Sequence, residues 1–169
     1  MKDGFLKVAA ATREVKVADT VWNREKIGEM IEEGKKAHVK IMVFPELALT
    51  AYTCGDLFGQ NALIRSARRE LSVLAKSTEG SDILVFVGLP WEDGGKLYNV
   101  AAAVQDGKIL GLVPKRHLPN YGEFYEARNF EPGEEQVRLI DIDGEAVPFG
   151  GDILFECKEL PSLVVGAEI

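Results

Sequence analysis

The stretch ILVFVGL, residues 83–89, indicates the fold class more clearly than any other part of the chain. A continuous apolar run of this length, with no polar alternation, is typical of a strand that is buried on both faces of a sheet. Two further apolar segments precede it, KIMVF at 40–44 and FLKVAAA at 5–11, and each is predicted to be a strand. Pro45 ends the 40–44 run. A sheet covered by helices is therefore expected for the first half of the chain.

Two amphipathic helices are predicted between these strands. Residues 22–37 carry apolar or small side chains at helical spacing, namely Ile27, Met30, Ile31 and Gly34. The second helix is predicted to begin near Asp56 as its N-cap and to turn one apolar face inward, formed by Ile64, Ala67, Leu71 and Leu74. Strand, helix, strand, helix and strand in this order predict an α/β domain.

The second half of the chain has a different pattern, in which short β runs are separated by turn residues. These predicted strands are 97–105, 108–113, 136–142, 145–149, 152–157 and 162–168. Asp106-Gly107 and Asp143-Gly144 are dipeptides that favour tight hairpins. No repeat or linker interrupts residues 1–169, so we expect one domain. The apolar run at 162–168 is expected to be a buried strand of an unfinished domain, which would leave an apolar face for self-association.

Composition narrows the classes of function. Hydrophobic residues make up 46% and charged residues 28%, which is ordinary globular usage. The net charge of −7 disfavours a nucleic-acid partner, because phosphate binding requires a basic surface. No apolar run approaches the roughly 20 residues that cross a bilayer, so no membrane segment is expected. The two cysteines, Cys54 and Cys157, form no disulfide framework, and we expect a cytoplasmic location.

Three segments could carry chemistry. Glu46 follows an apolar strand, where α/β proteins build sites, although an ordinary loop glutamate would look the same. Lys115 follows the predicted strand 108–113 and could hold an oxyanion, or it could be a solvated lysine at a sheet end. Residues 121–133 form a long loop with aromatic and acidic residues, which could line a polar pocket or pack on itself as an Ω-loop.

Taken together, three stretches resemble the nitrilase superfamily of carbon–nitrogen hydrolases. They are FPE at 44–46, PKRHLPNYGEFYEARNFEPG at 114–133 and VVGAEI at 164–169. The resemblance implies a four-layer αββα sandwich, incomplete at its C-terminal side, and a Glu–Lys–Cys triad. Glu46 matches the general base of that family, Lys115 the oxyanion lysine and Glu126 a fourth acidic residue. The nucleophilic cysteine of the family would come directly after Ile169, so these 169 residues alone are expected to be inactive.

Two stretches resemble one subgroup, the glutaminase domains of glutamine-dependent NAD synthetases. They are LTAYTCGDLF at 49–58 and VPFGGDILF at 147–155. The resemblance implies that glutamine is the substrate and that Tyr52, Tyr121 and Phe124 shape its pocket. It also implies a C-terminal synthetase domain as partner and a homo-oligomer. No cofactor is expected for residues 1–169, while ATP and magnesium would belong to the synthetase domain.

Two alternatives remain open from the sequence. The same triad would serve another nitrilase-superfamily enzyme, such as a carbamoylase or an aliphatic amidase. A non-catalytic oligomerisation or binding domain could use the same scaffold. Cys54 lies near a predicted helix start, which would lower the pKa of its thiol, but the subgroup resemblance implies a structural cysteine. His38 and His117 are too few and too far apart in the sequence to suggest zinc.

Overall fold

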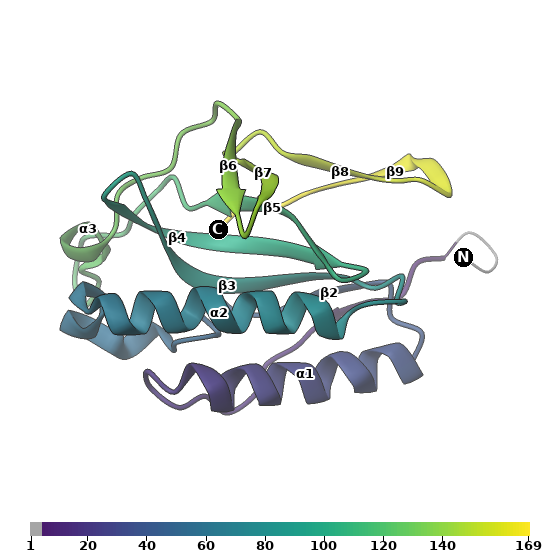
Figure 1. Cartoon of the computed structure of the whole chain (residues 1–169), viewed down its shortest axis with the longest axis horizontal. Coiled ribbons are helices and arrows are strands. Elements are labelled where there is room, and N and C mark those ends of the chain that lie inside the picture. Colours follow the sequence, from purple (N-terminus) through teal and green to yellow (C-terminus); the bar gives the residue numbers. More distant parts are fainter. Residues whose placement is uncertain (1–4) are drawn as a thin grey trace.

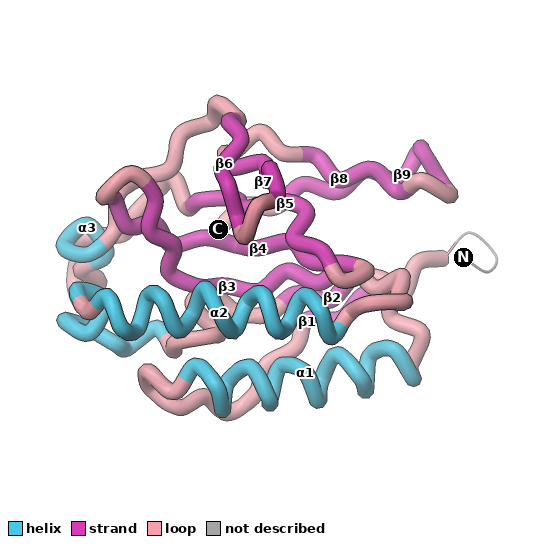
Figure 2. Tube along the Cα trace, viewed as in Figure 1, coloured by secondary structure: helices cyan, strands magenta, loops and turns pink. Residues whose placement is uncertain are grey.

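Three layers make up the structure, a computed structural model that describes residues 5–169. Two long helices lie side by side on one face of a seven-stranded sheet, and a two-stranded sheet lies over the other face (Figure 1). Figure 2 shows the same layers with the helices in cyan and the strands in magenta. The mixed α/β architecture predicted from the sequence is confirmed.

The strands and the two long helices follow the chain in the order that the sequence predicts, and two short helical segments that the sequence did not predict are present as well. The helices are α1 (Thr20–Lys36), the 3-10 segment η1 (Tyr52–Gly59), α2 (Asn61–Ser77) and the short α3 (Glu126–Asn129). The strands are β1 (Val8–Ala10), β2 (Ile41–Val43), β3 (Leu84–Asp93), β4 (Lys96–Gln105), β5 (Lys108–Pro114), β6 (Arg138–Ile142), β7 (Glu145–Phe149), β8 (Leu154–Cys157) and β9 (Leu160–Gly166).

The large sheet has the strand order β1-β2-β3-β4-β5-β7-β6. β1, β2 and β3 are parallel, and they are joined through α1 and α2 as the alternating pattern requires. β3 is buried from Leu84 to Trp91, so the apolar run at 83–89 does form a strand covered on both faces. Its helix-side residues pack with the inward faces of α1 and α2, which include Ile27, Ile31, Leu71 and Leu74.

The two predicted hairpin turns are confirmed. Asp106 and Gly107 join β4 to β5 with φ values of 47° and 77°, and Asp143 and Gly144 join β6 to β7 with 55° and 89°. Positive φ at both central residues belongs to the turn whose twist matches that of the strands, and the Asp-Gly pair tolerates it best. The two Asp-Gly turns therefore determine how the strands pair next to each turn, Gln105 with Lys108 and Ile142 with Glu145.

The predicted start of the second helix is wrong. α2 begins at Asn61 with Gln60 as its N-cap, whereas Asp56 lies inside the preceding 3-10 segment. Gly55 has φ 54° and ψ −128°, which are not helical, so a kink interrupts the 3-10 segment just before Asp56. Gln60, with φ −93° and ψ 111°, is extended and separates this segment from α2. The Asp56 carboxylate lies 2.9 Å from the Arg128 guanidinium instead of capping a helix.

The expectation of a buried last strand is also wrong. β9 pairs antiparallel with β8 in a separate two-stranded sheet, and each of its residues is half-buried or exposed. Phe155 and Val165 of this small sheet pack on Leu84 and Phe86 of β3. Pairing with β8 satisfies the backbone groups on one edge of β9 without placing this strand in the large sheet.

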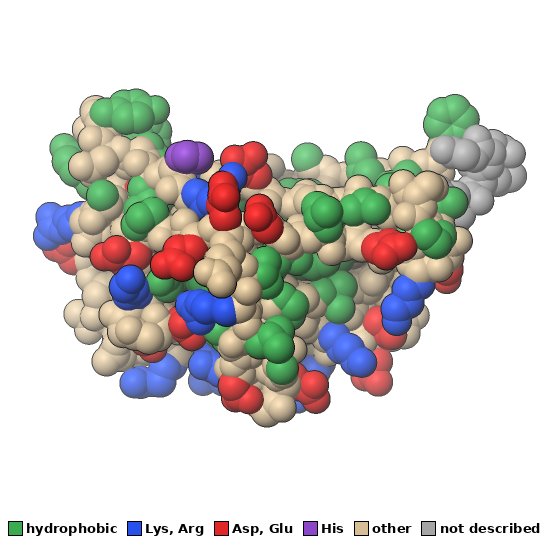
Figure 3. Space-filling view, turned by 90° about the horizontal axis from the view of Figure 1, so that it is seen from above, with side chains coloured by type: hydrophobic (Ala, Val, Ile, Leu, Met, Phe, Trp, Pro, Cys, Tyr) green, Lys and Arg blue, Asp and Glu red, His purple; other side chains and the backbone are tan. Residues whose placement is uncertain are grey.

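The outer side of the hairpin is open to solvent among the residues described. Leu154 is 71% exposed and Val164 is 49% exposed. Seen from this side, hydrophobic side chains lie between charged ones across the surface (Figure 3). Among the described residues, no helix has the length and apolar character needed to cross a membrane.

Candidate active site

Glu46 lies in the loop that leaves β2, and β3 determines the position of this loop. The backbone of Phe44 donates to Phe86, and that of Leu49 donates to Gly88 at 3.1 Å. A Cβ at Gly88 would lie 2.3 Å from the Leu47 nitrogen and 2.6 Å from the Glu46 Cα. Only a residue without a side chain allows this approach, so Gly88 fixes where Glu46 emerges. Glycine within a strand pattern is a signal that sequence reasoning could have used.

Lys115 follows β5 and is held by backbone bonds on both sides. Its N–H donates to the Asn99 carbonyl at 2.8 Å, and its carbonyl accepts from the Gly133 N–H at 2.8 Å. Gly133 comes so close that a Cβ there would lie 2.5 Å from the Pro114 side chain. Lys115 is only 7% exposed, so it is not the solvated lysine of the alternative interpretation.

The structure brings the three predicted charged residues together. Lys115 Nζ donates to Glu46 Oε2 at 2.8 Å and to Glu126 Oε1 at 2.8 Å. Glu126 opens α3 in the long loop and is 4% exposed, while the Glu46 side chain keeps 33% of its surface exposed. One carboxylate is thus buried behind the ammonium group, and the other lies at the open side.

This arrangement keeps Lys115 protonated. Burial alone would lower the pKa of Lys115, but hydrogen bonds to Glu126 and Glu46 outweigh burial and raise the pKa. A lysine ammonium has three donor protons. Two of them bind the carboxylates, so one N–H has no partner among residues 5–169 and could bind a ligand oxygen.

Tyr52 and Asn99 are the neutral partners of the two carboxylates. The Tyr52 hydroxyl donates to Glu126 Oε1 at 2.7 Å, and Asn99 Nδ2 donates to Glu46 Oε2 at 2.8 Å. Burial raises the pKa of Tyr52, and the bond to Glu126 raises it further, so the phenol stays a donor. Sequence reasoning missed Asn99, although an amide inside the apolar strand LYNVAAAV was a usable signal.

The three residues predicted to shape a pocket form a chain of aromatic contacts. Phe124 meets Tyr52 edge-on at 6.5 Å between ring centroids, and Tyr121 meets Phe124 at 5.7 Å. Tyr121 is 72% exposed. The aromatic chain therefore leads from the Glu126 carboxylate outward to solvent, and its role in binding remains a prediction.

The two cysteines lie in other surroundings. Cys54 is buried with Leu47, Phe58 and Leu63, and its thiol donates to the Thr50 carbonyl at 3.0 Å. Burial raises the pKa of the Cys54 thiol, so the lowering that a nearby helix start suggested is wrong. Cys157 lies at the far end of β8 and is half-buried. Neither thiol has a hydrogen bond to the charged cluster.

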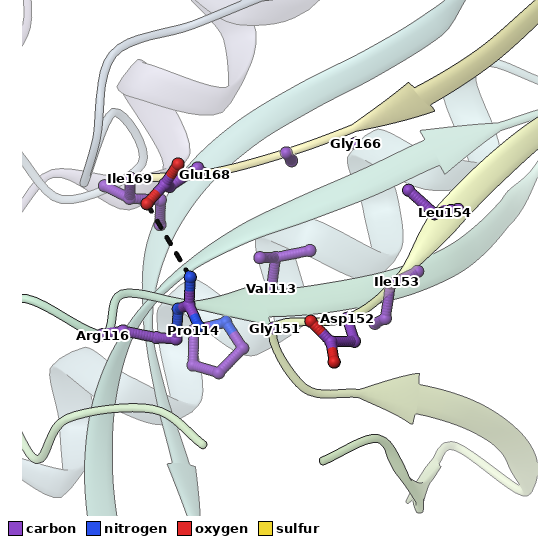
Figure 4. Close-up of a pocket in the computed structure, with 11 residues that line it drawn as sticks. Val113, Pro114, Arg116, Gly151, Asp152, Ile153, Leu154, Gly166, Glu168 and Ile169 are labelled. Carbon is purple, nitrogen blue, oxygen red and sulfur yellow. Dashed lines mark ion pairs between the residues drawn. The ribbon is translucent and has the colours of Figure 1, made fainter. Parts of the chain in front are cut away.

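A cavity of about 430 Å³ lies between the end of β5 and the residues after β9 (Figure 4). It is lined by Pro114 and Arg116 but not by Lys115, which alternates with them along the chain. The Arg116 guanidinium is already paired with Glu135 and lies 3.9 Å from Glu168. Glu46, Lys115 and Glu126 do not line this cavity, so the cavity and the charged cluster are separate features. We take the charged cluster as the candidate active site because it joins the three predicted charged residues.

A buried lysine held by two carboxylates at the rim of a helix-covered sheet suits chemistry at a polar carbonyl. The chain belongs to the carbon–nitrogen hydrolase family, whose model matches residues 7–169.

Within this family, the chain is similar to proteins of one kind. The chain is 36% identical over 168 residues to the glutamine-dependent NAD(+) synthetase of Mycobacterium tuberculosis, and over 146 residues to that of Aquifex aeolicus. These matches cover 98% and 86% of this chain, but only 24% and 25% of the relatives. The chain thus spans about a quarter of the length of the curated relatives it matches.

Solved structures agree with the fold. The crystal structure of a glutamine-dependent NAD(+) synthetase from Cytophaga hutchinsonii superposes with a TM-score of 0.88 at 30% identity, over 95% of this chain and 27% of that one. An amidase from Nesterenkonia sp. has a TM-score of 0.65 at 20% identity, over 85% of this chain and 54% of that one, and shows the fold alone.

Proposed function

We propose that the chain supplies the general base and the oxyanion lysine of a glutaminase site, in a protein that makes NAD from glutamine-derived ammonia. The observation that supports this is the Lys115 ammonium group, buried and held at 2.8 Å by both Glu46 and Glu126. The relatives at 36% identity, which are named glutamine-dependent NAD(+) synthetases, indicate the substrate.

In this proposal a thiol attacks the side-chain carboxamide of glutamine. Glu46 accepts the thiol proton as the carbon–sulfur bond forms, and the free N–H of Lys115 binds the developing oxyanion. Glu46 then returns the proton to the nitrogen, the carbon–nitrogen bond breaks, and ammonia leaves. Water, deprotonated by Glu46, attacks the thioester and releases glutamate. Tyr52, Phe124 and Tyr121 border the route by which glutamine enters.

The nucleophile in this scheme is a thiol from outside the 169 residues. Cys54 is buried with a raised pKa, so a thiolate there is disfavoured. A chain of these 169 residues alone is therefore expected to release no ammonia. The ammonia would be consumed by a further domain that activates its substrate with ATP and magnesium, and that domain would be the partner of this one.

The test is ammonia release from glutamine by the protein expressed from the gene that encodes this chain. Glu46→Gln keeps the shape of the side chain but cannot take up a proton, so kcat should fall by about 10²- to 10⁴-fold. The matched control is Glu79→Gln, at an exposed glutamate, which should change nothing. Equal activity of Glu46→Gln and wild type would contradict the proposal, as would release from simple aliphatic amides but not from glutamine. Cys54→Ala should remain active.

A further inference from the structure

We propose that Asn99 is a positioning residue that determines which oxygen of Glu46 carries the proton. The inference deepens the proposed function and rests on it, because it assigns a proton position to the residue proposed as the base. Asn99 does not touch the reacting atoms in this scheme, and it acts through Glu46.

The two oxygens of Glu46 have different surroundings. Oε2 accepts two hydrogen bonds, from Asn99 Nδ2 at 2.8 Å and from Lys115 Nζ at 2.8 Å. Oε1 has no hydrogen-bond partner among residues 5–169. A proton on Oε2 would point at groups that only donate, so it would break one of these bonds. The structure therefore assigns Oε1 as the oxygen that takes up the proton and gives it back.

Asn99 is better suited than Lys115 to fix this choice. It lies on the long strand β4 and is fully buried, and its backbone carbonyl accepts the backbone N–H of Lys115. One residue in the middle of the sheet thus connects a base and a cation that come from different loops. The amide can hold only one orientation, since turning it would place its oxygen against the Glu46 carboxylate.

The Asn99 side chain lowers the stability of the fold, and this supports a role at the site. Its Oδ1 is buried without a hydrogen-bond partner among the described residues. A buried, unsatisfied amide oxygen costs about 1–3 kcal/mol, so an apolar side chain at position 99 would suit stability better. The neighbours Val100, Ala102 and Ala103 are apolar and fully buried. The bond to Glu46 explains why an amide occupies this position.

The experiment measures kcat, KM and the pH profile of kcat/KM for ammonia release from glutamine by the protein expressed from the same gene. Asn99→Leu has a similar volume but no donor. We expect kcat to fall roughly 10- to 100-fold with little change in KM, because Glu46 is no longer held in its reactive geometry. The acidic limb of the profile should move to higher pH, because the ionised carboxylate has lost a donor.

The matched control is Thr78→Val, which removes another fully buried polar group, one that binds Gly107 at the far end of β4. It should lower stability but leave both kcat and the acidic limb unchanged. If Asn99→Leu does not fold, Asn99→Ser is smaller, cannot overfill the site and should give the same shift of the limb.

The outcomes separate the two proposals. An unchanged acidic limb and kcat in the folded Asn99 variant, together with an inactive Glu46→Gln variant, would overturn the role of Asn99 alone. A fully active Glu46→Gln variant would overturn the proposed function itself. If Thr78→Val moves the acidic limb as far as the Asn99 variant does, the shift reports lost stability, and Asn99 is only a structural residue.

Discussion

The two ends of the β4–β5 hairpin have different structures. At one end, Asp106 and Gly107 close a tight turn, and the Gly107 N–H donates to Thr78. At the other end the strands diverge, and Asn99 and Lys115 turn their side chains toward Glu46. The turn itself is formed by neighbours in the sequence, whereas Glu46 at the site end lies 53 and 69 residues from its two partners.

The two ends also differ in whether their charged side chains are exposed or buried. The turn end keeps Asp106 and Lys108 at the surface, where solvent screens them. The site end buries an ammonium group between two carboxylates, which is costly unless every ion keeps its partner. Stability at the turn end therefore depends on backbone conformation, and stability at the site end depends on charge pairing.

The largest effect is expected from Lys115→Met. The variant keeps the length of the side chain but leaves Glu126 buried without its cation, which should lower the free energy of unfolding by about 3–5 kcal/mol. The same substitution at the turn end, Lys108→Met, should cost less than about 0.5 kcal/mol because that lysine is exposed. Urea unfolding measures both, and equal costs would remove the distinction between the two ends.

A smaller effect is expected from Gly107→Ala. Gly107 has a φ of 77°, so a side chain there is strained by about 1–2 kcal/mol. The control is Gly28→Ala in α1, where a Cβ would meet nothing within 4 Å and alanine should stabilise the helix by about 0.5–1 kcal/mol. Thermal unfolding should move in opposite directions for the two variants. A stabilised Gly107→Ala protein would contradict the described turn.

The smallest effect is on the pH dependence of stability. The pKa of Lys115 is raised above 10.5 and that of Tyr52 above 10.0, so the folded state holds both protons more tightly than the unfolded state does. The stability they contribute is fully present below about pH 10 and is lost as the pH rises through the raised values. Unfolding by urea between pH 9 and 11 should show a shallower decline for Tyr52→Phe than for wild type. A parallel decline would argue against the Tyr52–Glu126 bond.

The sequence predicted the fold where local patterns decide it. The apolar run of β3, the helical spacing of α1 and the two Asp-Gly turns all describe interactions between near neighbours in the chain. β9 was misplaced because apolar content indicates a strand but not the sheet that the strand joins. The start of α2 was misplaced because Gln60, an extended residue that makes no side-chain cap hydrogen bond, precedes the helix, so no capping side chain in the sequence marks this start.

The candidate site was predicted in part. Glu46, Lys115 and Glu126 were identified by resemblance and do converge, while no periodicity in the sequence relates them. Asn99 was missed because its importance comes from its bond to Glu46, which lies 53 residues away in the sequence. The Tyr52 hydroxyl is bound to Glu126, a contact that only tertiary structure reveals.

The separation of these residues along the chain has a consequence for folding. The bonds of Glu46 to Asn99 and Lys115 span 53 and 69 residues, and the bond of Tyr52 to Glu126 spans 74. Closing loops of this length costs entropy that only a nearly complete sheet offsets. The hairpin turns can form while the chain is still open, and the Lys115–Glu126 bond spans only 11 residues. We expect the bonds of Glu46, and that of Tyr52 to Glu126, to form only once β3, β4 and β5 align, and therefore to be among the last contacts to assemble.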